Sequence, residues 1–279
     1  MIFIGATLII FNLLSVFVTS FDASPVTKTH ILTQAAKVRD TLPIFEDLPP
    51  PSSQLSYSSC YQRPNGPRGF CNWLIPGRVM IGQYPGPEDF VVQRDESKDH
   101  IDKMVQDANV RVFCCLQDEI PPQDDFATWT FFDGKYQTNA VFRDQGRYLH
   151  HYGKIAKHAL SSSSEDITFL HAPITDLSTP DSTSLILLLS QILDELQRQR
   201  PIYIHCWRGR GRAGTIGAIL VGLLYPELES VDCLEWVQRG YGTRKGAAFL
   251  PATSQKSPQT SDQRDFVQRF INDIRNTMT

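Results

Sequence analysis

Three short apolar runs and two longer segments set the pattern of the C-terminal two-thirds of the chain. The runs at residues 110–116, 167–170 and 201–204 are rich in β-branched and aromatic residues, which predicts buried strands. Residues 181–198 place leucine and isoleucine at helical spacing, and residues 213–224 are apolar enough for a buried helix. Strands that alternate with helices favour an α/β fold with a twisted, parallel-dominated central sheet flanked by helices.

The N-terminal part of the chain departs from this pattern. Residues 1–21 hold no charged side chain and resemble a signal peptide, and their length would also just span a bilayer as a membrane anchor. Residues 22–59 are interpreted as a Pro/Ser-rich linker or transit-like segment without a packed core. The folded domain is assigned to residues 60–279, with an irregular insertion at residues 117–164. The apolar N-terminus would allow membrane contact and favours a secretory, membrane-attached or organelle-targeted protein, with the cytoplasm as the alternative.

Composition limits the classes of function. The chain has 279 residues, of which 41% are hydrophobic and 20% charged, and its formal net charge is −3. This is enough for one substantial core and offers no case for nucleic-acid binding through bulk positive charge. Six cysteines would permit disulfides in an exported protein, and Cys60 and Cys71 could close a small loop. Cys114 and Cys115 lie in a predicted core strand, where cysteine is an ordinary small apolar residue.

One segment combines a strand, a glycine loop and a helix with reactive side chains. Cys206 follows the apolar run at residues 201–204, and the next six residues hold three arginines and two glycines. A glycine loop turns backbone N–H groups into a concave nest, and the N-terminus of the following helix points at the same place, which predicts a pocket for a tetrahedral oxyanion. Helix N-termini and nearby cations favour a thiolate, so Cys206 is a candidate nucleophile. The planar guanidinium of Arg212 could bind two oxygens of the anion.

This segment resembles the signature of an enzyme family. Residues 205–212, His-Cys-Trp-Arg-Gly-Arg-Gly-Arg, match the His-Cys-x-x-Gly-x-x-Arg motif of the cysteine-dependent protein tyrosine and dual-specificity phosphatases. Residues 72–86 and 257–268 resemble bacterial-type small dual-specificity phosphatases. The resemblance implies a protein tyrosine phosphatase-like fold and hydrolysis of phosphomonoesters, in proteins carrying phosphotyrosine, phosphoserine or phosphothreonine, through a phosphocysteine intermediate. It implies no cofactor and no metal.

The resemblance also assigns roles to individual residues. It makes Cys206 the nucleophile, Arg212 the group that grips the phosphate and Asp176 the general acid, which protonates the leaving group. His205 and Gln263 would support the site. The phosphate would be bound by the loop residues Trp207, Arg208, Gly209, Arg210, Gly211 and Arg212.

Asp181 competes with Asp176 for the role of the acid on spacing alone. Thr179, Pro180 and Asp181 have the cap, the first-turn proline and the first-turn acid that typically begin a helix. This argument favours a structural role for Asp181 and Asp176 as the acid.

One departure from the family pattern bears on the rate, and two further loop arginines bear on the substrate. The family usually has serine or threonine directly after the arginine, whereas this chain has Ala213, so a slowed second step is expected unless the hydroxyl of Thr215 substitutes. Arg208 and Arg210 would suit an anionic phospholipid or inositol polyphosphate substrate, or they simply point into solvent. A catalytically slow, phosphate-binding pseudophosphatase is a further interpretation. Sulfur transfer of the rhodanese type is disfavoured by the acid segment and the flanking stretches.

The histidine pair and two of the cysteines suggest further hypotheses. The pair His150-His151 has no cysteine or carboxylate spacing typical of a metal site around it and is expected at the surface. A redox-protective bridge from Cys115 to Cys206 is a hypothesis that the sequence alone does not decide.

Overall fold

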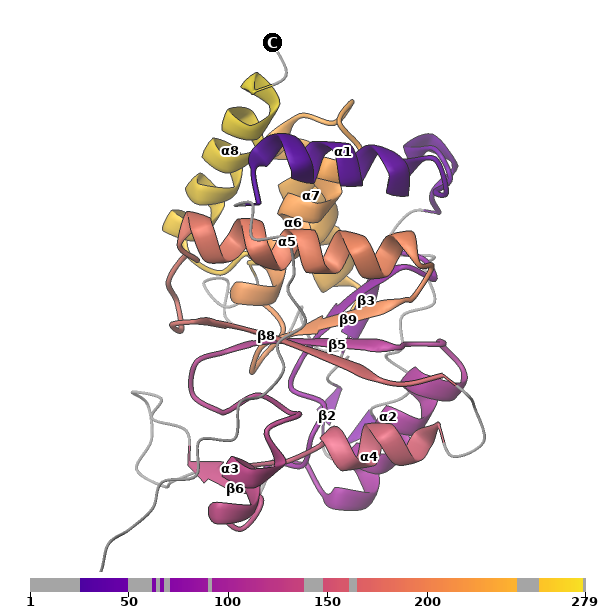
Figure 1. The fold of residues 1–279 in the computed structure, drawn as a ribbon, viewed down its shortest axis with the longest axis vertical. Coiled ribbons are helices and arrows are strands. Elements are labelled where there is room, and N and C mark those ends of the chain that lie inside the picture. The colour runs from indigo at the N-terminus through magenta and orange to yellow at the C-terminus, as the bar shows by residue number, and fades with distance from the viewer. Residues whose placement is uncertain are drawn as a thin grey trace, which may run out of the picture.

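A five-stranded sheet forms the centre of the protein. The computed structural model describes residues 26–49, 62–63, 66–67, 71–89, 92–137, 148–160, 165–244 and 256–277. The sheet has the order β3-β4-β9-β5-β8, in which β3 and β4 pair antiparallel and every other neighbouring pair is parallel (Figure 1). This confirms the predicted parallel-dominated sheet. Its strands are β3 (Cys71–Ile75), β4 (Val79–Gly82), β5 (Val112–Gln117), β8 (Thr168–Ile174) and β9 (Ile202–His205).

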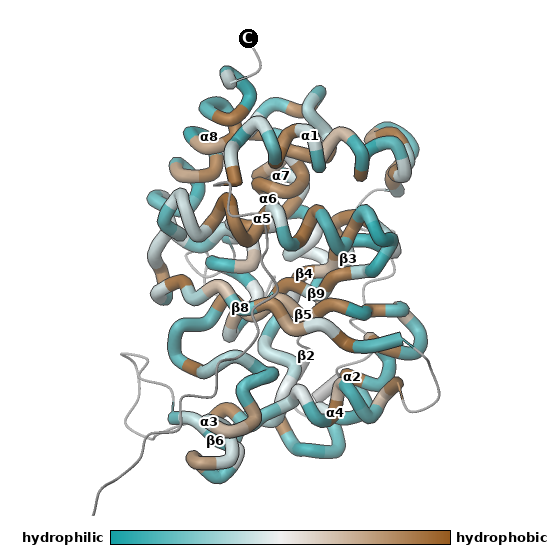
Figure 2. Tube along the Cα trace, in the orientation of Figure 1, coloured by the Kyte–Doolittle hydropathy of each residue, from teal (hydrophilic) through white to brown (hydrophobic). Residues whose placement is uncertain are grey.

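Helices cover both faces of this sheet, as predicted. Figure 1 shows the larger group of helices on one side of the strands and α2 and α4 on the other. All 13 residues of α6 are buried, which agrees with the apolar segment predicted at residues 213–224. Hydrophobic residues concentrate in the central strands and in α6 (Figure 2). The larger group contains α1 (Lys28–Arg39), α5 (Ser182–Gln197), α6 (Arg212–Leu224), α7 (Ser230–Gly242) and α8 (Ser261–Asn276), and the other face has α2 (Arg94–Gln106) and α4 (Gly153–Ala159).

The insertion after β5 is more regular than predicted. Besides α4 it contains α3 (Phe126–Phe131) and a two-stranded sheet of β6 (Lys135–Gln137) and β7 (Tyr148–His150). Asp125 caps α3 by accepting from the N–H of Thr128 at 3.0 Å, and the buried Trp129 donates from Nε1 to the Pro122 carbonyl at 2.8 Å. Elements of three to seven residues are too short to display a hydrophobic period, which explains the wrong prediction.

The interpretation of residues 22–59 as a linker without a core is wrong for residues 26–49. Helix α1 packs against α5 and α6, and Ile31, Ala35 and Val38 are fully buried in the main hydrophobic core. These side chains repeat at intervals of three and four, which is the helical period that the surrounding proline- and serine-rich composition obscured. The folded domain therefore begins well before residue 60.

Three shorter elements follow α1 among the described residues before β3. They are the 3-10 helix η1 (Phe45–Asp47) and the paired strands β1 (Gln62–Arg63) and β2 (Gly66–Pro67). The ring of Phe45 packs edge-on against Trp236, with centroids 4.8 Å apart. The predicted signal peptide or anchor at residues 1–21 lies outside the described residues. Within the described ranges, no helix is long and apolar enough to cross a membrane.

The burial of α1 predicts a measurable contribution to stability. We expect Ile31→Ala to lower the free energy of unfolding by about 2–5 kcal/mol, because it removes a buried side chain and leaves a cavity. Urea denaturation of the full chain measures this. Lys37→Ala, on the exposed side of the same helix, is the control and should change stability by less than about 0.5 kcal/mol. Equal effects of the two substitutions would show that α1 does not belong to the core.

Candidate active site

The glycine loop lies where four parallel strands end. Residues 206–211 connect β9, in the middle of the sheet, to the N-terminus of α6. The cap position of α6 is Gly211, which offers no side-chain acceptor, and the first turn holds no acidic residue. The first N–H groups of the helix therefore face the loop without a side-chain partner, which is the arrangement that binds an anion.

The loop carbonyls are held from outside the loop. The carbonyl of Trp207 accepts from the N–H of Tyr84 at 3.1 Å, that of Gly209 from Arg244 Nη1 at 2.8 Å, and that of Arg210 from the Ser257 hydroxyl at 2.9 Å. In a planar trans peptide the N–H points opposite to the carbonyl. The N–H groups that follow these carbonyls therefore point the other way, toward the concave side of the loop.

Glycine is required at position 209. Its φ is +63°, and a Cβ built there would lie 2.1 Å from the carbonyl carbon of Gly82 at the end of β4. An L side chain would meet both a strained backbone conformation and a backbone collision. The loop can therefore sit directly on the end of β4 only with glycine at this position.

Arg212 is a buried guanidinium with an ordered set of partners. Its side chain is 1% exposed and binds Glu119 with both terminal nitrogens, Nη1 to Oε2 at 2.7 Å and Nη2 to Oε1 at 2.9 Å. Nη1 also donates to the Ile174 carbonyl at 2.9 Å. Burial alone lowers the pKa of Arg212, but the hydrogen bonds to Glu119 and the nearby Cys206 and Asp176 raise it above its ordinary value. Among the described residues Nε has no partner, so it remains available to a ligand oxygen.

Two further carboxylates lie beside this guanidinium. Asp176 Oδ1 is 3.3 Å from Nη2 of Arg212, and Asp118 Oδ1 is 3.5 Å from Nη1. The Asp176 side chain is 48% exposed and follows the end of β8, so it reaches the mouth of the loop. Asp181 instead caps α5 by accepting from the N–H groups of Thr183 and Ser184. The structural role predicted for Asp181 is confirmed, but the cap is Asp181 itself and not Thr179, because α5 begins at Ser182.

His205 is embedded in an aromatic cluster under the loop. It is fully buried, and its Nε2 forms a 2.7 Å hydrogen bond with the hydroxyl of Tyr152. The rings of Tyr84, Tyr152 and Tyr203 surround it at centroid distances of 5.5–5.7 Å. Burial, with smaller contributions from His171 and Arg212, lowers the pKa of His205 to about 3. The imidazole is therefore neutral at physiological pH and serves as packing around Cys206, itself 3% exposed.

The polar residues behind the loop join it to α8 and to the acid segment. Gln263 is fully buried; its Oε1 accepts from the N–H groups of Gln259 and Thr260, and its Nε2 donates to the Ser178 carbonyl at 3.0 Å. A Cβ on Gly211 would lie 3.1 Å from this amide, so Gln263 adjoins the loop. Its amide groups are committed to holding the backbone near Asp176.

The three loop arginines have different environments. Arg210 is 8% exposed and donates from Nε to Gln259 Oε1 at 3.2 Å, so it is part of the scaffold. Arg208 is exposed, with its guanidinium carbon 5.0 Å from the centre of the Trp207 ring. Of these three residues, Arg208 is therefore the one that presents a cation at the rim of the loop.

The hydroxyl of Thr215 does not compensate for Ala213. Thr215 is fully buried and its Oγ1 donates to the Gly211 carbonyl at 3.0 Å, which is a bond within the first turn of α6. Ala213 is also fully buried. In this first turn, the hydroxyl that the family motif places after the arginine thus has no counterpart directed at Cys206.

Sequence reasoning missed Glu119. The residue follows β5 at the same sheet edge as Cys206, where the carboxyl ends of parallel strands meet. A pair of carboxylates directly after a predicted buried strand, here Asp118 and Glu119, was the available signal. Its bidentate contact with Arg212 depends on the strand order and was not readable from spacing.

The described cysteines are all free thiols: Cys71, Cys114, Cys115, Cys206 and Cys233. Burial raises the pKa of Cys115 to about 12, so this thiol is unreactive at neutral pH. Cys115 and Cys206 form no bridge with each other. The suggested bridge from Cys60 to Cys71 involves Cys60, which lies outside the described residues.

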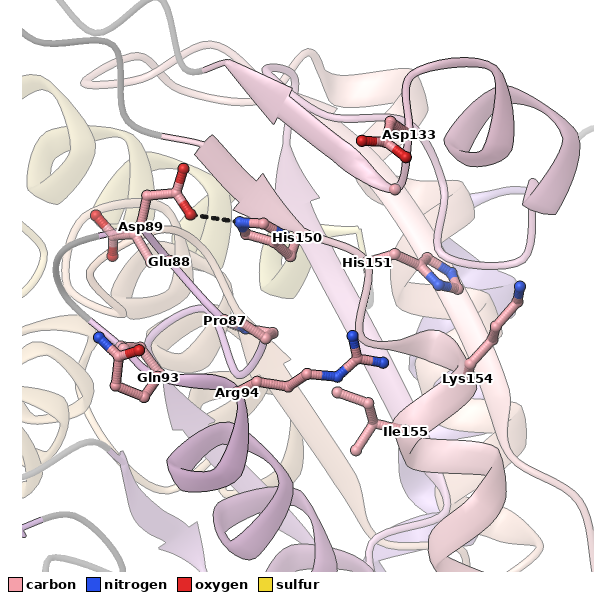
Figure 3. A pocket seen from close by; sticks show the side chains of 12 residues that line it. Pro87, Glu88, Asp89, Gln93, Arg94, Asp133, His150, His151, Lys154 and Ile155 are labelled. Atoms are coloured by element: carbon pink, nitrogen blue, oxygen red, sulfur yellow. Dashed lines mark hydrogen bonds and ion pairs between the residues drawn. The ribbon is translucent and has the colours of Figure 1, made fainter.

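A separate hollow of about 420 Å³ lies between the N-termini of α2 and α4 (Figure 3). His150 Nε2 is 2.6 Å from Asp89 Oδ1, and His151 Nε2 lies 2.8 Å from the Gln123 carbonyl. Both histidines are partly exposed and line this hollow, which agrees with the surface position predicted for them. In the part of the chain that the structure describes, no group of three or more metal-ligating side chains occurs.

The buried neutral state of His205 predicts a pH-dependent stability. Its pKa is about 3 in the fold against about 6.5 when unfolded, so the unfolded chain takes up the proton first. The contribution of His205 is fully present above pH 6.5 and is lost as the pH falls toward 3. The free energy of unfolding should fall by about 1.4 kcal/mol per pH unit for each such histidine. Buried His100, with its pKa also lowered to about 3, adds a similar slope.

Urea denaturation between pH 7 and 5 tests this expectation. His205→Gln should remove about half of the two-histidine slope. His30→Gln, at an exposed position on α1, is the control and should leave the slope unchanged. An unaltered slope in His205→Gln would contradict the neutral buried state.

One family model matches part of this chain in sequence. Residues 149–223 match the family model described as "Tc-R-P: Polymorphic toxin system, DSP-PTPase phosphatase", and this range includes Asp176, Cys206 and Arg212. No curated protein matches the chain in sequence.

Solved structures that resemble the chain are phosphatases of low sequence identity. PTPMT1 in complex with PI(5)P is 16% identical, with 75% of this chain and 99% of that chain covered and a TM-score of 0.49. The core catalytic domain of the PP-IP phosphatase SIW14 from S. cerevisiae is 12% identical, with coverages of 76% and 94% and a TM-score of 0.42. TpbA from P. aeruginosa is 13% identical, with coverages of 72% and 86% and a TM-score of 0.40. The match to the DSP-PTPase phosphatase model at residues 149–223 covers the strand, loop and helix that hold Cys206 and Arg212, the segment whose motif resembles this family.

Proposed function

We propose that this protein is a cysteine-dependent phosphatase that hydrolyses phosphomonoesters through a phosphocysteine intermediate. The observation that carries the proposal is the convergence of three groups at one sheet edge. Cys206 begins an anion-binding loop, Arg212 closes it, and the Asp176 carboxylate lies 3.3 Å from that guanidinium. A nucleophile, a phosphate-binding cation and an acid thus meet around one pocket.

In the first step the Cys206 thiolate attacks phosphorus, and a sulfur–phosphorus bond forms as the bond to the ester oxygen breaks. Asp176, protonated at this stage, gives its proton to the departing oxygen, which is a poor leaving group as an alkoxide or phenolate. The alcohol leaves and the phosphoryl group stays on Cys206.

In the second step water attacks the phosphocysteine. The Asp176 carboxylate takes a proton from the water, the sulfur–phosphorus bond breaks and the electron pair returns to sulfur as the thiolate. Inorganic phosphate leaves. The loop N–H groups and Arg212 stabilise the phosphoryl oxygens in both steps, and Glu119 keeps the guanidinium oriented without any motion during the reaction.

The rim cation Arg208 favours a second candidate for the substrate class. A phosphoprotein substrate of a dual-specificity phosphatase needs only the phosphate pocket and a shallow opening to it. A phosphoinositide or inositol polyphosphate carries further phosphates that Arg208 would attract, whereas Arg210 is held by Gln259 and offers little. Asp118 and Asp176, whose carboxylates lie beside Arg212, would repel such phosphates.

Turnover should depend on Cys206 and Asp176 in different degrees. We expect Cys206→Ser to abolish phosphate release from an aryl phosphate, because the nucleophile is lost. Asp176→Asn should lower the rate by about 10²–10⁴, most strongly for substrates with poor leaving groups. Asp181→Asn, at the cap of α5, is the matched control and should keep near-normal turnover. Full activity in Cys206→Ser would exclude the phosphocysteine route.

The substrate class is resolved by the same assay with a panel of phosphopeptides, phosphoinositides and inositol polyphosphates. If polyanions are the substrates, Arg208→Ala should raise KM for them several-fold while the aryl phosphate is unaffected. Arg269→Ala, at an exposed position on α8, controls for the loss of one surface charge. A preference for phosphopeptides that Arg208→Ala leaves unchanged would assign the protein-phosphatase class.

The absence of a hydroxyl at position 213 predicts a slow second step. Pre-steady-state kinetics of the native chain should show a burst of released alcohol followed by slow turnover, because phosphocysteine accumulates. Ala213→Ser should shorten the slow phase by supplying a hydroxyl to the departing thiolate. Ala218→Ser, further along α6, is the control for a buried hydroxyl. A burst-free time course, with no gain in Ala213→Ser, would refute this prediction.

Orthovanadate binding without turnover on any substrate would favour a pseudophosphatase.

A further inference from the structure

A buried arginine outside the signature motif touches the phosphate loop from behind. Arg244 lies two residues after the end of α7, and 3% of it is exposed. Its Nη1 donates to the Gly209 carbonyl at 2.8 Å, its Nε to Asn72 Oδ1 at 2.8 Å and its Nη2 to the Ile81 carbonyl at 3.1 Å. One side chain thus joins the loop to β3 and β4.

The partners of Arg244 carry no charge. Two other arginines near the central sheet have a carboxylate partner, Arg212 in Glu119 and Arg200 in Glu195 at 2.6 Å. Among the ion pairs of the described residues none includes Arg244, and its hydrogen-bond acceptors are two backbone carbonyls and one amide. Burial lowers the pKa of Arg244, but a guanidinium stays protonated in proteins, so a positive charge without a carboxylate partner among the described residues remains there.

The position of this charge determines what it can act on. It lies on the carbonyl side of the Gly209 peptide, so the N–H of Arg210 points to the opposite, concave side of the loop. A cation at the carbonyl end of a peptide also strengthens the donor at its N–H end. In a buried setting its field is poorly screened and extends to the groups on the other side of the loop.

We propose that Arg244 is a positioning residue whose unneutralised positive charge stabilises the Cys206 thiolate and a bound phosphate, while its hydrogen bond fixes the Gly209 peptide. Cys206 and the phosphoryl oxygens are then the missing counter-charges of this buried guanidinium. This inference rests on the proposed function for its biological meaning, but thiolate formation and anion binding can be measured without turnover.

A merely structural role would give a different result. If Arg244 only links strands to the loop, its loss should lower stability and leave the acidity of the Cys206 thiol unchanged. Arg275 provides the matched control, because its guanidinium donates to the carbonyls of Leu228 and Gly222 at 2.8 and 2.9 Å. It forms no ion pair within the described part of the chain. Arg275 lies on α8, and its two acceptors lie in α6 and between α6 and α7, away from the loop.

Three substitutions separate charge from scaffold. Arg244→Met removes both the charge and the hydrogen bonds. Arg244→Lys keeps the charge. Asn72→Asp keeps the guanidinium and its acceptor oxygen but places a carboxylate next to it, which neutralises the charge where it stands. Arg275→Met reports the cost of losing a half-buried guanidinium elsewhere in the domain.

The experiment uses the full chain and two readouts. The first is the pH dependence of iodoacetamide alkylation at Cys206, followed by mass spectrometry of the peptide that contains it. The second is the Kd of orthovanadate at pH 7. We expect Arg244→Met and Asn72→Asp to move the alkylation midpoint up by about one pH unit and to weaken orthovanadate roughly tenfold. Arg244→Lys should keep the alkylation midpoint and the orthovanadate Kd close to those of the native chain, and Arg275→Met should change neither quantity.

Two results would overturn the inference, and a third would separate it from the proposed function. An alkylation midpoint in Asn72→Asp equal to that of the native chain, in a protein that melts normally, would overturn it. A midpoint shift in Arg275→Met as large as that in Arg244→Met would overturn it as well. If the native chain binds orthovanadate and has an acidic thiol but releases no phosphate from any ester, the proposed function fails, while the Arg244 effect on both readouts still stands.

Discussion

The burial of the Arg212 guanidinium is the constraint around which the glycine-loop edge of the central sheet is arranged. A charged group with 1% of its surface exposed needs acceptors for its N–H groups, since an unpaired buried charge would cost several kcal/mol. Glu119 from the end of β5, the Ile174 carbonyl from the end of β8 and Asp176 beyond it provide them. Satisfying one arginine therefore brings two strand ends and the proposed acid together.

The same principle extends to the backbone of the loop. Its carbonyls at Trp207, Gly209 and Arg210 are bound by groups from outside, so its N–H groups are directed inward before any ligand arrives. These partners come from the segment after β4, the end of α7 and the approach to α8. A pocket formed in this way is preorganised, and its geometry depends on elements that are distant from it in sequence.

Electrostatics divide the pocket into two sides. Carboxylates at Asp118, Glu119 and Asp176 surround Arg212, whereas Arg208 occupies the rim and Arg244 lies buried behind the loop. The neutral His205 contributes shape without charge, because burial removes its capacity to hold a proton near neutral pH. For the proposed function, this arrangement favours one tightly held phosphate with the proposed acid beside it over a broadly cationic groove.

Local sequence determined the parts of this protein whose physics is local. The strand, the glycine loop and the apolar helix α6 are contiguous, so their order alone predicted the anion pocket and placed Cys206 and Arg212 in it. Three adjacent residues, 179–181, indicated the start of α5 in the same way, although the cap is Asp181 and not Thr179 as predicted. Tertiary structure decided what depends on strand order and packing: the docking of α1, the pairing of Glu119 with Arg212, and the contact of Arg244 with Gly209. The last two contacts join residues 93 and 35 positions apart, and no periodicity or spacing encodes which distant groups will meet.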